Sequence, residues 1–251
     1  MGKAGFWKTD WFLGVVVTLV MLALNGSDLV QSLERKAYDM GVRASTRPPS
    51  DRIAVIAIDD HSVANLGRWP WPRDLHAKLT DLLAGAQAKV IGNTVFFYEP
   101  EIGAGYAYIA KLTDLVNQAA AEGAAPTPEM EKIAAVLKEA EEALNTDRKL
   151  ADSYARANSV LLPLTFQLGD ARGRPDKPLP DFVARNRVVQ VTPGSGVALP
   201  GVQVQIPVEA VGARAAALGH LNANPDIDGG IRTEPLVVQY FDQYYPSLAL
   251  M

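Results

Sequence analysis

The residues of this chain whose types and spacing could support chemistry are a few acidic side chains. Asp59 and Asp60 end an apolar run, 53–59, that predicts a buried strand, and open α/β sheets bind ligands at the carboxyl ends of their strands. Asp59 has a second interpretation, in which it hydrogen-bonds the backbone of the turn that follows. Asp226 and Asp228 are spaced like the first ligands of a calcium loop. The third ligand and the later glutamate are missing, so we predict a turn there.

Motifs for catalysis are absent from the sequence. It contains no phosphate-binding Gly-x-x-x-x-Gly-Lys loop, no His-Glu-x-x-His zinc helix and no Gly-x-Ser-x-Gly nucleophile turn. The three histidines, His61, His76 and His220, are far apart, and lone histidines are more often structural than metal-binding. We therefore expect no catalytic residue, no metal and no cofactor. A secreted hydrolase is disfavoured because no nucleophile and base form a pair.

Composition narrows the class of protein further. Of 251 residues, 48% are hydrophobic and 21% are charged, which is the balance of a globular chain rather than a disordered one. The chain has no cysteine, so it has no disulfide and no thiolate metal site. Its 24 basic and 28 acidic residues give a net charge of −4, and without a basic run it is not expected to bind nucleic acid.

The N-terminus contains an apolar segment that could anchor the chain in a membrane. Residues 11–27 carry no charge, and most of the segment is apolar on every side of a helix, whereas a buried core helix would keep a polar stripe. It is about 25 Å long as a helix, the short end of a membrane span. Lys3 and Lys8 precede it, as the positive-inside preference requires. We expect a transmembrane helix with residues 1–10 in the cytoplasm and 28–251 outside; a cleaved signal peptide and a buried helix are the alternatives.

Beyond residue 27 the pattern alternates between helix and strand. Ser27 or Asp28 can cap a helix that Pro48 and Pro49 end, and its apolar side chains repeat at helical spacing. Alternating strands and helices require right-handed crossovers, so we predict an α/β fold with a mixed, partly parallel sheet flanked by helices. The apolar positions of that first helix are Leu29, Leu33, Ala37 and Met40. The segments expected as strands are 53–59, 89–97, 159–166, 188–191, 217–221 and 231–240, and a helix is expected at 73–83.

Residues 103–145 interrupt this alternation and predict an inserted helical hairpin. Two narrow apolar seams are separated by residues 123–128, where Thr127 can cap the second helix and Pro128 suits its first position. The hairpin could lie on the sheet as additional core, or it could project as an arm for interaction. A further helix, 147–157, returns the chain to the sheet. The seam residues are Ile109, Leu112, Val116 and Ala119, then Met130, Ile133, Leu137, Ala140 and Leu144.

One segment is far more specific than the others. Residues 58–76 read Ile-Asp-Asp-His-Ser-Val-Ala-Asn-Leu-Gly-Arg-Trp-Pro-Trp-Pro-Arg-Asp-Leu-His. This segment resembles the signature of CHASE2, the type-two CHASE sensory domain (cyclases/histidine kinases associated sensory extracellular). Residues 85–100 resemble the second strand of that family, and 218–222, 226–232 and 245–249 are similar to its closing block. The resemblance runs in order over residues 28–251.

The resemblance implies a sensory domain of a bacterial membrane receptor. Its output would be a nucleotide cyclase, a histidine kinase or a serine/threonine kinase that is not among these residues. We expect a periplasmic sensory domain, an anchor in the inner membrane and an extracellular signal as ligand. Two departures are Asn93, where the family usually has aspartate, and the inserted hairpin at 103–145. The signature or ligand-binding residues that the resemblance implies are Asp59, Asp60, Trp69, Trp71, Arg73, His76, Asp226, Asp228 and Arg232.

The signature turn also has a structural interpretation. A residue before proline is pushed into an extended conformation, so the two Trp-Pro pairs preset the backbone. We expect Trp69 and Trp71 to bury large faces, and Arg73 to bond carbonyls of the turn or a carboxylate such as Asp59. Direct contact of these side chains with a ligand is the alternative.

Together these features predict a membrane-anchored, extracytoplasmic sensory domain that is not itself an enzyme. The alternative is a structural or self-assembly module that uses the helical seams of the hairpin. A receptor of this kind needs a partner to move against, and twofold association is the commonest arrangement. We expect a homo-oligomer that forms through the first helix after the anchor (Leu29, Leu33, Ala37 and Met40), helped by the hairpin.

Overall fold

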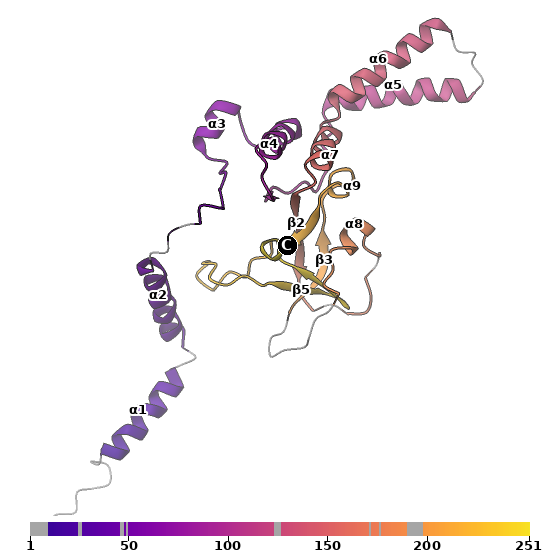
Figure 1. The fold of residues 1–251 in the computed structure, drawn as a ribbon. Helices are drawn as coiled ribbons and strands as arrows, with labels where there is room; N and C mark the ends of the chain where they lie inside the picture. Colours follow the sequence, from indigo (N-terminus) through magenta and orange to yellow (C-terminus); the bar gives the residue numbers. More distant parts are fainter. Residues whose placement is uncertain are drawn as a thin grey trace, which may run out of the picture. The chain divides into compact units, whose positions relative to one another are not determined.

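The computed structural model (Figure 1) describes residues 10–24, 27–45, 48, 50–122, 127–170, 172–175, 177–189 and 198–251. Its contacts divide the chain into two compact units, Met1–Asp59 and Asp60–Met251. The first unit holds the apolar N-terminal helix and the helix that follows it. The second unit holds the sheet and the signature turn.

Two helices are described in the first unit, α1 (Asp10–Leu24) and α2 (Asp28–Ala44). The side-chain oxygen of Ser27 accepts a hydrogen bond from the Val30 amide at 3.5 Å, so Ser27 is the N-cap of α2. The backbone amide of Ser45 bonds the carbonyls of Gly41 and Val42 and closes the last turn. The helix expected from Ser27 or Asp28 is confirmed.

The apolar helix α1 is shorter than the expected span 11–27, of which residues 25 and 26 lie outside the described residues. Within the part of the chain that the structure describes, no single helix is both long and apolar enough to cross a membrane. By length and composition, α1 and α2 meet that requirement as a pair with a bend between them. The transmembrane anchor therefore stays a prediction.

The segment 53–59 does not form the buried strand that its apolar run predicted. It has no regular secondary structure, and Ile53 and Val55 expose 73% and 88% of their surface. An unbroken apolar run indicates burial on both faces of a sheet, but it carries no information about the neighbouring strand that must supply the hydrogen bonds. The prediction of a strand is wrong here, and Asp59 does not follow one.

The second unit is built on a six-stranded mixed sheet. The central strand β2 pairs in parallel with β1 and β4 along its first half and antiparallel with β3 along its second half. β3 pairs in parallel with β5, which pairs antiparallel with β6. The expected mixed, partly parallel sheet is confirmed. The strands are β1 (Ile91–Gly92), β2 (Val160–Leu168), β3 (Leu199–Gln205), β4 (Ala217–His220), β5 (Val237–Tyr240) and β6 (Gln243–Pro246).

Several strands differ in extent from those expected. The segments 159–166 and 217–221 correspond closely to β2 and β4, but 89–97 shortens to β1 and 231–240 shortens to β5. Residues 188 and 189 form no strand, while 190 and 191 lie outside the described residues. The strand β3 was not predicted, because its sequence Leu-Pro-Gly-Val-Gln-Val-Gln contains two residues that ordinarily disfavour strands.

The core of the second unit is centred on β2. Val160, Leu162 and Leu164 are fully buried, and their alternate spacing places them on one face of the strand. Leu150 and Tyr154 of α7 (Thr146–Ala157) are also fully buried and belong to the same apolar cluster. The hydrophobic effect of this cluster holds α7 on the sheet.

Helices α4 (Arg73–Gly85) and α7 pack against each other, which confirms the helices expected at 73–83 and 147–157. The Ser153 hydroxyl donates to the Ala77 carbonyl at 3.0 Å and to Asp81 at 2.8 Å, so a buried polar contact fixes their register. The remaining short helices are α3 (Asp60–Leu66), α8 (Asp181–Ala184), α9 (Glu209–Gly212) and the 3₁₀ turn η2 (Leu248–Leu250).

The helical hairpin consists of α5 (Ala104–Ala121) and α6 (Pro128–Leu144), and residues 123–126 between them lie outside the described residues. The Thr127 hydroxyl accepts a hydrogen bond from the Met130 amide at 3.2 Å, so the expected cap forms. The two helices lie side by side and extend away from the sheet as an arm, instead of covering it (Figure 1).

The seam between β4 and the end of the chain requires a glycine. A Cβ atom on Gly219 would lie 2.6 Å from the Leu248 Cα and 2.7 Å from the Leu248 amide nitrogen, where it meets backbone that cannot rotate away. We predict that Gly219→Ala lowers the free energy of unfolding by about 1–3 kcal/mol, as overpacking of a core does. Urea unfolding measures this. Gly85→Ala is the matched control, since nothing lies within 4 Å of its Cβ position, and an equal loss in both variants would contradict the prediction.

Candidate functional site

The aromatic residues of the signature turn form a cluster around His76. The Trp71 indole N–H donates to the Gly67 carbonyl at 2.8 Å and closes the turn. Trp69 contacts Trp71 edge to face, with ring centroids 5.5 Å apart, and contacts His76 in the same way at 5.8 Å. The His76 ring in turn meets Phe97, at 5.4 Å. The peptide bond between Trp69 and Pro70 is cis.

Trp69 is less buried than expected. It retains 37% exposure, while Trp71 is half-buried and His76 is buried. The expectation that both tryptophans bury large faces holds for Trp71 and in part for Trp69, which still buries more than half of its surface.

Arg73 is the first residue of α4 and is buried, with 7% exposure. Its guanidinium donates from Nη1 to the Asp147 carboxylate and from Nη2 to the Glu99 carbonyl. The same group lies over the ring of Phe97, 5.3 Å from the ring centroid, which adds a cation–π contact. The sequence had suggested Asp59 as a possible carboxylate partner of Arg73. The carboxylate that pairs with Arg73 in the structure is instead Asp147.

Glu101 joins the same network from the other side. One of its carboxylate oxygens accepts from the Arg73 amide at 2.9 Å and from the Thr146 hydroxyl at 2.5 Å. The Glu101 amide donates to the Asp147 carboxylate at 3.2 Å. One ionic cluster thus connects the start of α4, the segment before α5 and the start of α7. Arg73, Glu101 and Asp147 are called the Arg73 network from here on.

The Arg73 network lies at the base of the hairpin. Glu101 is two residues before Gly103, the N-cap of α5, and Asp147 is three residues after Leu144, the end of α6. Asn145 reinforces the base, since its amide donates to the Tyr106 hydroxyl at 3.2 Å and its Oδ1 accepts from the Arg148 amide at 2.9 Å. The signature arginine therefore holds both ends of the hairpin against the sheet domain.

Burial shifts the pKa values of Arg73 and His76 in the same direction. Desolvation lowers the pKa of Arg73, and the nearby Glu101 opposes that shift. A guanidinium stays charged even so, because its ordinary pKa lies far above neutral pH. Desolvation also lowers the pKa of His76; Glu101 raises it and Arg73 lowers it further. The charge of the cluster is therefore that of Arg73 and its two carboxylates, beside a histidine that burial favours in its neutral form.

Asn93, which departs from the aspartate that the family resemblance led us to expect, has a structural role. Its amide nitrogen donates to the Tyr154 hydroxyl at 2.9 Å, and its Oδ1 accepts from the Val95 amide at 2.8 Å. Burial raises the pKa of Tyr154, with the Asn93 hydrogen bond lowering it in part. A neutral amide satisfies this buried hydroxyl without adding a further charge near Arg73.

Asp226, Asp228 and Arg232 form a separate cluster on a turn. Arg232 Nη1 donates to Asp226 at 2.7 Å and to Asp228 at 2.9 Å. The Gly229 amide donates to the Asp226 carbonyl at 2.8 Å, which forms the expected turn. Both carboxylates face a cation of this chain, so the segment does not have the arrangement of a calcium loop. Among the residues that the structure describes, no group of three or more His, Asp or Glu could hold a metal ion.

The site residues expected from the sequence thus occupy three places. Trp69, Trp71, Arg73 and His76 come together, and Asp226, Asp228 and Arg232 come together on their own turn. Asp59 and Asp60 are exposed, and Asp60 begins α3. Sequence reasoning missed Glu101 and Asp147. The sequence held only weak indications of them. Glu101 follows the segment expected as a strand at 89–97, and Asp147 lies in the first turn of the helix expected at 147–157.

Sequence reasoning also missed a groove of about 480 Å³ beside the carboxyl ends of β1 and β4. Ligands of open α/β sheets bind at such ends. Asn222 is committed to the strand, because its side chain exchanges two hydrogen bonds with the Phe166 backbone, at 2.9 Å and 2.6 Å. The polar lining that remains includes Thr94, Thr233 and Glu234. The other lining residues are Gly92, Leu221, Ala223, Ile231, Leu248 and Ala249.

The sheet and the helices that flank it define a mixed α/β domain. The chain matches the family model of the CHASE2 domain over residues 14–251 and belongs to that family. CHASE2 domains are extracytoplasmic sensory modules of membrane receptors, so the family resemblance and the sensory role are confirmed. No curated protein and no solved structure matches the chain.

We predict that Arg73→Met lowers the free energy of unfolding by about 3–5 kcal/mol, because it leaves the half-buried Asp147 carboxylate without its cation and the Glu99 carbonyl without its donor. Chemical unfolding of the second unit measures the loss. The matched control is Arg156→Ala, which breaks the exposed ion pair of Arg156 with Asp81, 2.8 Å long, and should cost at most about 1 kcal/mol. Similar losses in the two variants would contradict a buried, structural role for Arg73.

His220 predicts a dependence of stability on pH. The residue is fully buried, its Nδ1 accepts from the Asn222 amide at 3.3 Å, and desolvation lowers its pKa from 6.5 to about 4. Between these values the unfolded chain binds the additional proton and the folded chain does not. The free energy of unfolding should therefore fall as the pH falls from about 6.5 to about 4.

His220→Gln should reduce this pH dependence, because glutamine does not titrate. Urea unfolding at several pH values in that interval measures the slope. His61→Gln, at an exposed histidine, controls for the loss of one imidazole. If His220→Gln has the same slope as the parent chain, the neutral state of His220 does not contribute to stability.

Proposed function

We propose that this chain is the signal-input domain of a receptor in the bacterial inner membrane, with the second unit in the periplasm. Its output would be an intracellular serine/threonine kinase or nucleotide cyclase carried outside these residues. The observation that carries the proposal is membership of the CHASE2 family over residues 14–251, which includes the signature turn. Reading the coding sequence beyond residue 251 tests the output: a kinase or cyclase domain there supports the receptor, and its absence favours a self-assembly module.

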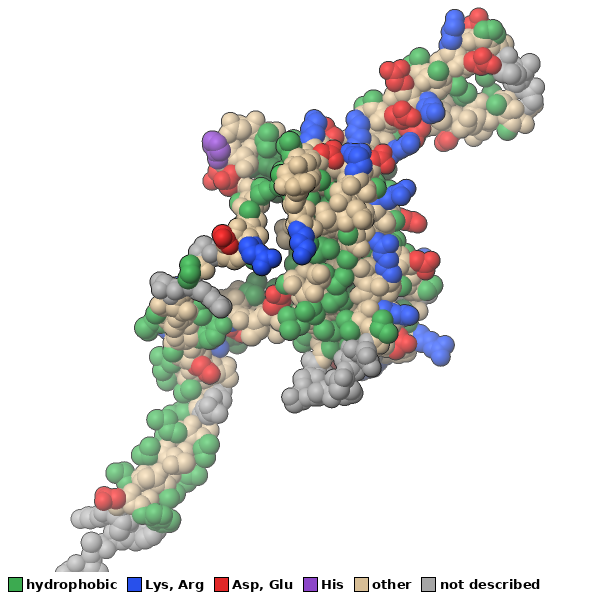
Figure 2. All heavy atoms as spheres, in the orientation of Figure 1, with side chains coloured by type: hydrophobic (Ala, Val, Ile, Leu, Met, Phe, Trp, Pro, Cys, Tyr) green, Lys and Arg blue, Asp and Glu red, His purple; other side chains and the backbone are tan. Residues whose placement is uncertain are grey.

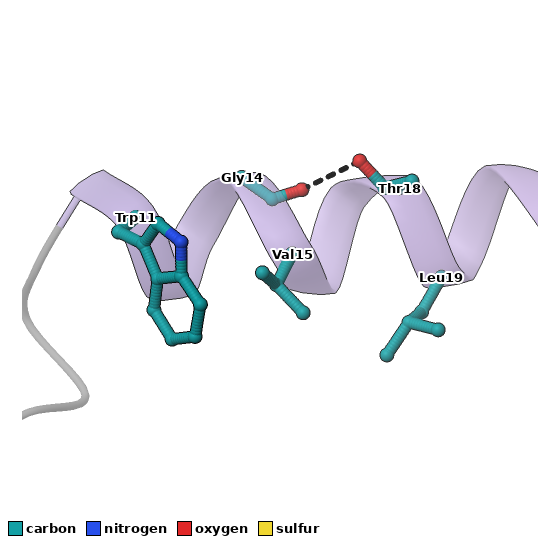
Figure 3. A pocket seen from close by; sticks show the side chains of 5 residues that line it. All are labelled: Trp11, Gly14, Val15, Thr18 and Leu19. Atoms are coloured by element: carbon teal, nitrogen blue, oxygen red, sulfur yellow. Dashed lines mark hydrogen bonds between the residues drawn. The ribbon is translucent and has the colours of Figure 1, made fainter.

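The surface of α1 supports a membrane anchor. After Asp10 the helix has no charged residue, and Figure 2 shows hydrophobic side chains around it. Its one hydroxyl, that of Thr18, donates to the Gly14 carbonyl at 2.9 Å (Figure 3), so it is satisfied inside the helix, as a lipid environment requires. The side chains of Trp11, Val15 and Leu19 point to one side of α1 and, with Gly14 and Thr18, line a shallow apolar groove (Figure 3).

The groove beside β1 and β4 is the better candidate for binding the signal. The Arg73 network already uses its charged groups within the chain, and the indole N–H of Trp71 is bonded to the turn. These groups serve as a scaffold. By contrast, Thr94, Thr233 and Glu234 add polar groups to an open groove that is otherwise mostly apolar, and they suit a small molecule that has both apolar and polar parts.

Self-association through α2 is a further part of the proposal. Leu29, Leu33 and Met40 are exposed along α2, and Ala37 lies between them at helical spacing. A second copy packed on this stripe would give each anchor a partner to move against when the signal binds. The hairpin offers a second exposed apolar surface, which favours the alternative function, a self-assembly module.

We predict that a topology reporter fused after Arg43 is active outside the cytoplasm and that the protein sediments with membranes. The physical reason is that an uncharged helix with two lysines before it inserts with those lysines in the cytoplasm. A soluble chain trimmed to begin near Gly26 would instead identify residues 11–27 as a signal peptide. Reporter activity inside the cytoplasm would contradict both interpretations.

A further inference from the structure

The hairpin exposes a set of large apolar side chains in addition to those that join α5 to α6. Leu137 is buried between the two helices, and Ile109 and Val116 are half-buried there. Leu112 and Ile133, which the sequence assigned to this seam, instead remain about half exposed. The exposed fractions are 67% for Tyr108, 48% for Leu112, 60% for Leu115, 51% for Ile133 and 64% for Val136.

These five side chains lie on one face of the hairpin. On α5, one side of the helix is followed by positions 108, 112 and 115. On α6, one side is followed by positions 133, 136 and 140. Each of these stripes lies about a quarter turn from the seam, in the same rotational sense about its own helix. Because the two helices run antiparallel, the same rotation turns both stripes to one side. The opposite side carries Asp114, Asn117 and Lys138. Tyr108, Leu112, Leu115, Ile133 and Val136 are called the hairpin face.

We propose that the hairpin face binds the hairpin face of a second copy of this chain, and that the two hairpins point the same way and form a four-helix bundle with twofold symmetry. The face presents on the order of 500 Å² of apolar surface, near the upper limit of what a monomeric protein exposes. Two such faces would bury on the order of 1,000 Å², the lower bound of a specific interface. Figure 2 shows hydrophobic side chains exposed along α5 and α6 among acidic and basic ones.

Charge complementarity selects a second copy in parallel orientation. The hairpin register is fixed at its base, because Tyr106 bonds Asn145 and a Cβ on Gly105 would lie 3.6 Å from Leu144. Counting along both helices from there places Lys111 and Glu139 at the same level, on the outer edges of α5 and α6. A twofold axis parallel to the hairpin sets α5 against α6 of the second copy. Lys111 then lies beside Glu139 of the second copy, and the reciprocal pair forms by symmetry.

This interface goes beyond the proposed function and does not depend on it, because a sensor and a self-assembly module could both use it. It differs from the α2 stripe, which lies in the other unit. The Arg73 network connects the base of the hairpin to the start of α4. If two hairpins associate, a change in their position would therefore be transmitted to the start of α4.

Disulfide crosslinking of the full chain in intact cells tests the proposal, since the natural sequence has no cysteine. Two chains with different tags would be coexpressed, one with Leu115→Cys and the other with Val136→Cys, because these positions share a level on α5 and α6. We expect a mixed crosslinked dimer. Adding Leu112→Glu to both chains should reduce its yield at least tenfold, while adding Asn117→Glu, on the opposite side, should leave it unchanged.

A charge exchange tests the orientation. Lys111→Glu alone should lower the crosslinking yield, and Lys111→Glu combined with Glu139→Lys should restore it, because the reciprocal pairs are rebuilt. The thermal unfolding of each variant verifies that the sheet domain is intact. A background yield from Leu115→Cys with Val136→Cys would overturn the proposal. So would a dimer that survives Leu112→Glu and is lost with Leu33→Glu, which would assign the association to α2.

Discussion

The arrangement of the second unit depends on the ion pair between the buried guanidinium of Arg73 and the Asp147 carboxylate. A cation at the first residue of a helix is opposed by the helix dipole, whose N-terminus carries partial positive charge. It is also desolvated, which disfavours any charge. The Asp147 carboxylate, the Glu99 carbonyl and the nearby Glu101 offset both costs, and they come from two segments far from Arg73 in sequence. The ion pair therefore stabilises one relative placement of α4, α7 and the base of the hairpin.

This placement separates structural from binding roles in the signature turn. The tryptophans and His76 pack around the same segment that carries Arg73, and their polar groups serve the turn itself. The groove beside β1 and β4 lies at a different part of the sheet and keeps polar groups in its lining. The groove adjoins β1 and β4, which both pair with β2, and α7 packs in the same apolar cluster as β2. Under our proposals, these packed elements, rather than a catalytic group, would connect a signal bound in the groove with an association of two hairpins.

Local patterns predicted the helices well and the strands less well. Ser27 and Thr127 cap α2 and α6 with their side chains. A cap depends only on residues close to it in the sequence, so local patterns could predict where these helices begin. The run 53–59 failed because a strand requires a partner, which no local pattern specifies. The strand β3 was missed because Pro200 and Gly201 interrupt its alternation; a Cβ at Gly201 would lie 3.2 Å from the Phe166 Cβ, so glycine leaves room for this residue of the paired strand β2.

The candidate site shows the same limit. The family resemblance singled out Trp71, Arg73 and His76 as signature residues, and we expected Arg73 to bond carbonyls of the turn or a carboxylate. The sequence could not identify Asp147 as that carboxylate, because the two residues are 74 positions apart and meet only after α4 and α7 pack together. Likewise, a helical wheel gives the apolar stripes of α5 and α6, but the choice of which stripe forms the seam depends on the partner helix. Long-range packing decides both.

The central claim, that Arg73 and Asp147 act as one unit at the base of the hairpin, is tested most directly by a double-mutant cycle. The free energies of unfolding of the parent chain, Arg73→Met, Asp147→Asn and the double variant would be measured in urea. If the pair is coupled as the structure indicates, the double variant is more stable than the sum of the single losses predicts, by about 1–3 kcal/mol. Losses that add to within about 0.5 kcal/mol would contradict it.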